Sequence, residues 1–240
     1  GAGKLWVDAA DGEYLLTSRP REGGERRGYA VEVYRSRDGE AYGLISSVSK
    51  EEVSAASGLR VQSIENQQIL RDPSTGLYHL YLSQDVAGEN VAGSADRIFE
   101  SRWGTYLMAS ADPSGPWRGG GFALRGEAGY DEREARDCTI DIIDGKYLCL
   151  YKARGARTNA VRTALAVSGD GRSWTKLGIP RVEGRPQGEF FLLNGSIIPG
   201  PLGPTFMGTE TTEVVKGAAL TRTFCAYALD LQALNPPRTL

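Results

Sequence analysis

One short pattern recurs four times along this 240-residue chain and limits the folds open to it. A turn residue precedes a strand-like run led by an aromatic residue in the segments DGEYLLTS, TGLYHLYLS, DGKYLCLYKA and GPTFMGTE. The aromatic markers Tyr14, Tyr78, Tyr147 and Phe206 lie 64, 69 and 59 residues apart. A hairpin repeated at this spacing predicts a repeat architecture built from strands.

A second element follows the first in three of the four units, in YRSRDGEAY, LMASADPSGPW and LAVSGDGRSW. In each, a strand ends in Ser, an Asp-containing turn follows, and an aromatic residue opens the next strand. The fourth unit ends in FCAYALDLQALNP, which lacks this turn but supplies a third strand. Each repeat therefore reads as a four-stranded antiparallel meander, and such meanders stack radially in a β-propeller with the first strand of each blade at the central axis.

The predicted fold is all-β, a single β-propeller domain over residues 1–240. One helix is expected over residues 50–57, because Ser49 and Glu52 form a capping box and Gly58 can end the helix. The segment DEREA, which ends at Ala135, is expected to add one helical turn.

Composition narrows the range of partners. The charged fraction of 24% and the net charge of −2 offer no bulk attraction to nucleic acid or to anionic lipid. No apolar run approaches the roughly 18–20 residues that span a bilayer, and the first residues lack the pattern of a signal peptide. We expect a soluble protein, either cytoplasmic or secreted after removal of a signal.

The three cysteines and the single histidine exclude several kinds of site. Cys138, Cys149 and Cys225 lie in apolar strand-like runs without metal-ligand spacing, so we expect buried free thiols rather than a disulfide or a metal site. His79 lies alone in LYHLYLS, which argues against a His-centred triad or a multi-His metal site. The sequence predicts no metal and no cofactor.

The segments ARDCTIDIIDGKYLCLYKA and YLMASADPSGPW together resemble the five-bladed propeller glycosidases, in particular glycoside hydrolase families 43, 62 and 32 and their relatives. In those families an acid near the start of an innermost strand precedes a similar hairpin. The resemblance implies a five-bladed ancestry, whereas four blades can be read here. We expect an incomplete chain that lacks part of one blade, and the alternative is a propeller of four blades. It also implies a carbohydrate ligand.

Two acids occupy similar places in their repeats. Asp137 precedes Gly145 by eight residues and Glu65 precedes Gly76 by eleven, and the turn after Glu65 is three residues longer, so the two acids are expected to be equivalent. Inner strands of a propeller converge on a channel, and cleavage of a glycosidic bond commonly uses two carboxyl groups facing each other across the bond. The alternative is a structural role, in hydrogen bonds to backbone amides or in pairing with Arg136.

Further catalytic candidates come from the first and last repeats. Counting from the turns aligns Lys4 with Asp137 and Asp8 with Asp141, which makes Asp8 a candidate base or a plain turn-flanking residue. In the last repeat, Glu189 of GEFFLLNGSIIPG is the candidate general acid.

The remaining candidates bind substrate rather than react with it. The RDC sequence resembles the RDP of the fructan-cleaving relatives, whose Asp binds sugar hydroxyls, although Cys138 replaces the proline. Trp103 lies in a polar loop and can stack on a sugar ring, whereas Trp117 and Trp174 belong to the turn motif and are expected in the core. The predicted substrate-binding set is Arg136, Asp141, Arg19, Trp103 and Asn194.

Two functions remain open. The first is a glycoside hydrolase that cleaves an oligosaccharide by carboxylate acid and base chemistry in the axial funnel. The second is a carbohydrate-binding propeller without catalysis, which Lys4 at an expected acid position favours. A propeller that binds other proteins is a third reading, and it would show a rim patch instead of converging acids.

Overall fold

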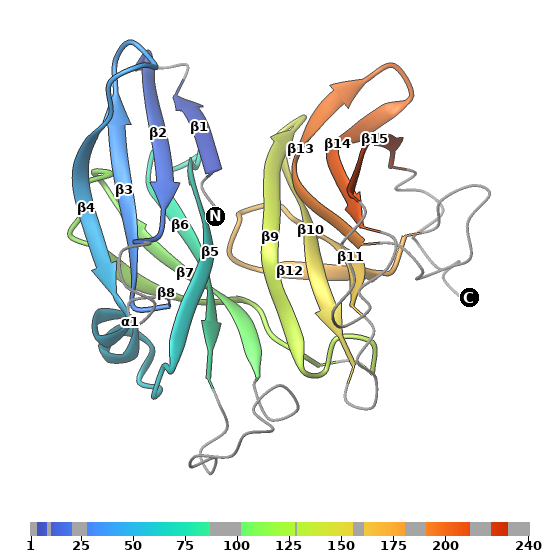
Figure 1. The fold of residues 1–240 in the computed structure, drawn as a ribbon, viewed down its shortest axis with the longest axis horizontal. Coiled ribbons are helices and arrows are strands. Elements are labelled where there is room, and N and C mark those ends of the chain that lie inside the picture. The colour runs from blue at the N-terminus through green and yellow to red at the C-terminus, as the bar shows by residue number, and fades with distance from the viewer. Residues whose placement is uncertain are drawn as a thin grey trace.

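The computed structural model describes residues 4–8, 11–20, 28–86, 102–127, 129–155, 161–180, 191–211 and 222–229. Almost all regular structure in these ranges is antiparallel β-sheet, which confirms the predicted fold class (Figure 1). No helix in these ranges is long and apolar enough to cross a membrane.

The first sheet, blade 1, has the strand order β1-β2-β3-β4. Its strands are β1 (Lys4–Asp8), β2 (Glu13–Ser18), β3 (Ala30–Ser36) and β4 (Gly43–Ser49). Helix α1 (Lys50–Ser57) follows as predicted: Ser49 and Glu52 form the capping box, and Gly58 ends the helix with a φ of 68°.

The next eight strands form blades 2 and 3. Blade 2 contains β5 (Ser63–Arg71), β6 (Tyr78–Asp85), β7 (Trp103–Ser110) and β8 (Arg118–Leu124). Blade 3 contains β9 (Glu134–Ile143), β10 (Lys146–Arg154), β11 (Arg162–Ser168) and β12 (Trp174–Gly178). One parallel pairing, between Trp103 and Glu134, links the two blades.

Blade 4 has three strands in the described part of the chain, β13 (Phe191–Gly200), β14 (Gly203–Thr211) and β15 (Arg222–Ala228). In Figure 1, blade 1 lies at the left in blue and blade 4 at the right in orange and red, with blades 2 and 3 following one another between them. The four blades that the repeats predict are therefore present in chain order.

Apolar layers between consecutive blades form the core. Val33 of blade 1 packs with Leu80 of blade 2 in the first layer, and Tyr81 of blade 2 packs with Cys149 of blade 3 in the second. Leu80 and Tyr81 are adjacent in β6, so their side chains point to opposite faces of the sheet, and each packs into a different layer. In the third layer, Leu165 of blade 3 packs with Phe206 of blade 4.

The predicted Ser and Asp turns are also present. In blade 3, Ser168 Oγ donates to Asp170 at 2.9 Å and accepts from the backbone N–H of Gly171 at 2.9 Å. Ser36 and Asp38 make the corresponding contact in blade 1. These turns connect the third and fourth strands of their blades, and their side-chain hydrogen bonds hold the turn in shape.

The cysteines are free thiols, as predicted. Cys138 and Cys149 are buried between blades 2 and 3, where burial raises the pKa of Cys149 well above its usual value. Cys225 is only partly buried. The expected helical turn in DEREA is wrong, because Glu134 and Ala135 begin β9, where Glu134 pairs with Arg154 and Ala135 with Ala153.

The first strand of each blade lies innermost, as predicted. Consecutive inner strands contact one another, β1 with β5, β5 with β9 and β9 with β13. Lys4 of β1 joins three of them, since its ammonium group donates to Gln68 at 3.0 Å, to Thr139 at 3.1 Å and to the backbone carbonyl of Cys138. These hydrogen bonds connect blade 1 to blades 2 and 3 along their inner strands.

Candidate functional site

Two β-bulges shape the starts of the inner strands in blades 2 and 3. The pairing of β5 with β6 shifts by one residue at Asn66, and the pairing of β9 with β10 shifts at the corresponding place, where Asp137 lies. Both residues have positive φ, 37° for Asn66 and 57° for Asp137. Asn and Asp tolerate this conformation better than other residues with a side chain, and bulges of this kind commonly re-aim side chains near active sites.

The strand register corrects the sequence alignment by one residue. Asp137 corresponds to Asn66, and Glu65 corresponds to Arg136, because the aromatic markers Tyr78 and Tyr147 pair with Arg71 and Ile142. The sequence count missed this because it took the loop after Glu65 to be three residues longer than the loop after Asp137, whereas the strand pairings make it two residues longer.

The same register changes the alignment of blade 1. Val7 pairs with Tyr14, which places Lys4 level with Gln68 and Thr139 rather than with Asp137. The expectation that Lys4 replaces an acid at the catalytic level is therefore wrong. Its hydrogen bonds to Gln68 and Thr139 agree with the corrected level.

Arg136 draws Glu65 and Asp137 together. Its Nη1 atom lies 3.5 Å from Glu65 Oε2 and 3.8 Å from Asp137 Oδ1. Arg19, on the other side, places its Nη1 3.1 Å from Glu65 Oε1. The structure thus brings four residues of the predicted site into one ionic cluster, although these contacts are also those that the structural alternative for Asp137 expected.

Trp103 completes this cluster. The centre of the Arg136 guanidinium lies 4.1 Å from the Trp103 ring centroid, which is cation–π geometry. A small hollow of about 180 Å³ adjoins the ring, lined by Arg102, Phe122 and Arg125 among others. Trp117 and Trp174 instead pack against the core layers, as predicted.

Glu134 is a third carboxylate in the network, which the sequence analysis missed. Its carboxylate pairs with Arg136 at 3.2 Å, with Lys152 at 3.1 Å and with Arg154 at 3.4 Å. Burial would raise the pKa of Glu134, but these three cations outweigh it and the pKa lies below its usual value. The alternation of acids and bases in EREARD was the available signal.

Asp137 is held in its ionised form. Burial would raise the pKa of Asp137, but the charges of Arg136 and Lys152 and hydrogen bonds from Asn66 and Ser83 lower it below its usual value. The Ser83 hydroxyl also accepts the backbone N–H of Asp137 at 2.9 Å, which fixes the bulge to blade 2.

Asp85 is the exception among these acids, and the sequence analysis missed it as well. It ends β6 opposite Trp103 and accepts the backbone N–H of Arg102 at 3.2 Å. Burial raises the pKa of Asp85 to about 6, and the nearby charges of Glu134 and Glu65 act in the same direction. Asp85 can therefore hold a proton up to about pH 6, well above the usual range of an aspartate.

Asp8 and Asp141 lie apart from this cluster. Asp8 accepts a hydrogen bond from Tyr78 at 3.1 Å and lies 3.5 Å from Arg71, at the opposite end of the inner strands from Glu65. Asp141 accepts the backbone N–H of Ile197 at 2.7 Å. The bulge at Asp137 interrupts the alternation that would have placed Asp137 and Asp141 on one face.

Two candidates of the last repeat have no described side chain. Glu189 lies outside the described residues, and Asn194 belongs to β13 but its side chain is not among those described. Among the described residues, no three His, Cys, Asp or Glu side chains form a group that could hold a metal ion.

Comparison with known proteins gives matches in structure but not in sequence. No protein-family model and no curated protein sequence matches the chain. A family 117 glycoside hydrolase of the marine bacterium Zobellia galactanivorans superposes with a TM-score of 0.58 at 17% identity, over 92% of this chain and 67% of that one.

Two further solved structures agree. The α-L-arabinofuranosidase of Fusarium graminearum superposes with a TM-score of 0.60 at 11% identity, over 94% of this chain and 60% of its own. The family 32 β-fructofuranosidase of Bombyx mori superposes with a TM-score of 0.63 at 13% identity, over 97% of this chain and 47% of its own. The chain spans about half to two thirds of the length of these proteins. It has the β-propeller fold that glycoside hydrolases of several families share.

Proposed function

We propose that the chain is a glycoside hydrolase-like propeller that binds an oligosaccharide at the Arg136 cluster and cleaves it by carboxylate chemistry. The observation that carries the proposal is the convergence of Glu65 and Asp137 on Arg136, with Trp103 stacked on the same guanidinium. Carboxylates and arginines bind sugar hydroxyls, and an indole face stacks on the apolar face of a sugar ring. The structural neighbours named above support a carbohydrate ligand.

The different pKa values of Asp137 and Asp85 assign each of them a role in cleavage of the glycosidic bond. Asp137, whose pKa is lowered, acts as the ionised carboxylate that activates water or attacks the anomeric carbon. Asp85, whose pKa is raised to about 6, donates a proton to the leaving glycosidic oxygen. Glu189 stays a candidate for the donor role. Glu65, paired with Arg19 and Arg136, binds hydroxyl groups and holds Arg136 in place.

A carbohydrate-binding propeller without catalysis is the second candidate. One observation favours it: Glu65, Glu134 and Asp137 are all paired with cations, so that Asp85 is the one acid of the described cluster with a raised pKa. A binding protein needs no proton donor, whereas a hydrolase does. The alignment of Lys4 with Asp137 no longer supports this reading.

One screen separates the two functions. The unmodified protein is incubated with a panel of plant and microbial oligosaccharides, and both released sugars and bound sugars are measured. The hydrolase predicts release of reducing ends from at least one member. The binding protein predicts saturable binding without release. Neither binding nor release across the panel would contradict both.

A further inference from the structure

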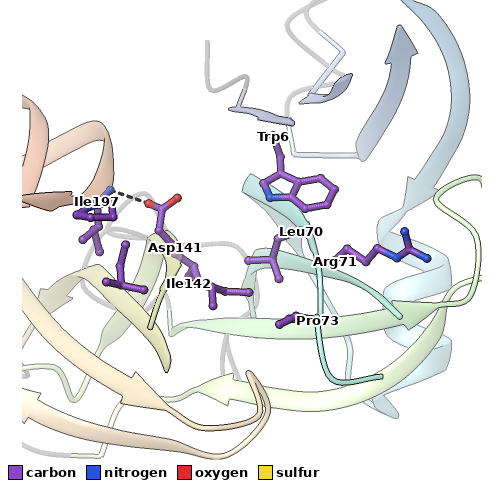
Figure 2. A pocket seen from close by; sticks show the side chains of 10 residues that line it. Trp6, Leu70, Arg71, Pro73, Asp141, Ile142 and Ile197 are labelled. Atoms are coloured by element: carbon purple, nitrogen blue, oxygen red, sulfur yellow. Dashed lines mark hydrogen bonds between the residues drawn. The ribbon is translucent and has the colours of Figure 1, made fainter. Parts of the chain in front are cut away.

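A second cavity lies on the propeller axis, away from the Arg136 cluster. It has a volume of about 360 Å³, and each inner strand contributes to its lining, Trp6 from β1, Leu70 from β5, Asp141 from β9 and Ile197 from β13 (Figure 2). Trp6, Leu70 and Asp141 occupy the same level of three successive blades, since their neighbours Val7, Arg71 and Ile142 pair with the aromatic markers. Small-molecule sites commonly measure about 300–1,000 Å³, so the cavity is large enough for a small ligand.

Most of the lining is apolar. Leu70, Ile142 and Ile197 form aliphatic walls, and Trp6 faces the cavity across from Asp141 (Figure 2). The Trp6 ring is fixed from behind by Tyr78, in a T-shaped contact with the ring centroids 6.4 Å apart. A ligand that fills this space must therefore present a mainly apolar body.

Asp141 is the polar group in the lining opposite Trp6. Its Oδ2 accepts the backbone N–H of Ile197 at 2.7 Å (Figure 2), whereas its Oδ1 makes no hydrogen bond with any described residue. Burial raises the pKa of Asp141 to about 6, and the Ile197 N–H and the charge of Lys4 act against this rise. At neutral pH the carboxylate is thus ionised with one oxygen available.

The charges around Asp141 favour a cation over an anion. Lys4 faces it from β1 but donates its hydrogen bonds to the layer with Gln68 and Thr139, and Arg71 of the cavity wall is paired with Asp8 and Asp11. Cys149 of β10 pairs with Ile140 and lies on the other face of the sheet, where burial raises the pKa of its thiol. Three acids and two bases give this group a net charge of −1, which favours a cation. Lys4 offsets part of the charge of Asp141 from a distance, but its hydrogen bonds go to Gln68, Thr139 and the carbonyl of Cys138.

We propose that the axial cavity binds a small organic ammonium ion, with its ammonium group on Asp141 and its apolar body against Trp6. Ion pairing and a hydrogen bond to Oδ1 provide the polar contact, and the indole face adds cation–π attraction. This binding is independent of the sugar chemistry proposed for the Arg136 cluster.

The test uses benzylamine as the probe and benzyl alcohol as its neutral counterpart. Backbone and indole N–H signals of Ile197 and Trp6 are followed by NMR in the unmodified protein at pH 7.5. We expect saturable shifts with benzylamine and binding of the alcohol at least about tenfold weaker. At pH 5, where most of Asp141 is protonated, benzylamine should bind about tenfold more weakly than at pH 7.5.

Two matched variants locate the binding. Asp141→Asn keeps an acceptor for the Ile197 N–H but removes the charge, and it should weaken benzylamine binding at least about tenfold. Asp144→Asn removes a carboxylate from the exposed turn of the same hairpin and should leave the affinity unchanged. Equal binding of amine and alcohol by the unmodified protein, equal effects of the two variants, or no saturable shift up to about 10 mM benzylamine would overturn the proposal.

Discussion

At the scale of single residues, the candidate site separates its acids by their surroundings. Arg136 forms ion pairs with Glu65, Glu134 and Asp137. Asp85 instead accepts one hydrogen bond, from the backbone N–H of Arg102. Burial alone would raise the pKa of both acids, but the cations beside Asp137 lower its pKa, whereas the pKa of Asp85 stays raised. Such a difference is what divides acid from base in many hydrolytic sites.

Asp85 gives a prediction about pH. Its pKa is raised from a usual value near 3.8 to about 6, so the folded protein holds more protons than the unfolded chain between these values. Stability from this group therefore falls as the pH rises through this window. Asp85→Asn should flatten that slope in urea unfolding measured from pH 4 to 7, whereas the exposed Asp144→Asn should not.

Activity offers a second readout for Asp85. If it donates the proton, hydrolysis of a substrate found in the screen should decline as the pH rises above about 6. An unchanged decline in Asp85→Asn would assign the proton donor elsewhere, with Glu189 the next candidate.

At the scale of elements, the axial layer around Lys4 holds three blades together. Lys4→Met keeps the length of the side chain but leaves the carbonyl of Cys138 and the side chains of Gln68 and Thr139 without this donor. We expect a loss of about 1–3 kcal/mol in the free energy of unfolding, measured by urea denaturation.

Lys146→Met provides the control for this layer, because Lys146 is an exposed residue of β10. Its effect should stay within about 0.5 kcal/mol. Equal unfolding free energies for the two variants would show that the Lys4 layer contributes nothing to stability.

The elements also show how far the sequence could predict this structure. The hairpins, the Ser and Asp turns and the capped helix follow from local patterns, and the structure contains them. The bulges at Asn66 and Asp137 have no local signature, and the pairing across the hairpin loops differs from the loop-length count by one residue. Asp85 was missed because its charged neighbours lie on other strands, so only the packed structure shows its surroundings. Glu134 had a local signal in its spacing from Arg136, but its other two partners, Lys152 and Arg154, lie on β10.

At the scale of the whole molecule, the two outermost blade faces expose apolar side chains. Leu5 and Val7 of blade 1 are 55% and 48% exposed, and Phe224 of blade 4 is 69% exposed. Every other blade face packs against a neighbouring blade through a core layer. A further blade would pack against these faces, and the five-bladed ancestry stays a prediction.

Replacing both Leu5 and Val7 with Thr tests the exposure of blade 1. In the 240-residue chain this change should reduce binding of a hydrophobic dye while changing the free energy of unfolding by less than about 1 kcal/mol. Val31→Thr, at a fully buried position of the same blade, should destabilise the chain by more. If the double variant were the less stable of the two, Leu5 and Val7 would have to be buried in solution.

Asp137 decides whether the Arg136 cluster is the sugar site. Asp137→Asn keeps the shape of the side chain but removes its charge, while Arg136 retains Glu65 and Glu134 as partners. With a substrate from the screen, the most direct measurement is kcat/KM for this variant beside its thermal midpoint. We expect kcat/KM to fall at least about 100-fold in a protein that stays folded. A destabilised Asp137→Asn that cleaves or binds the sugar as well as the unmodified protein would contradict it and leave Asp137 a structural partner of Arg136.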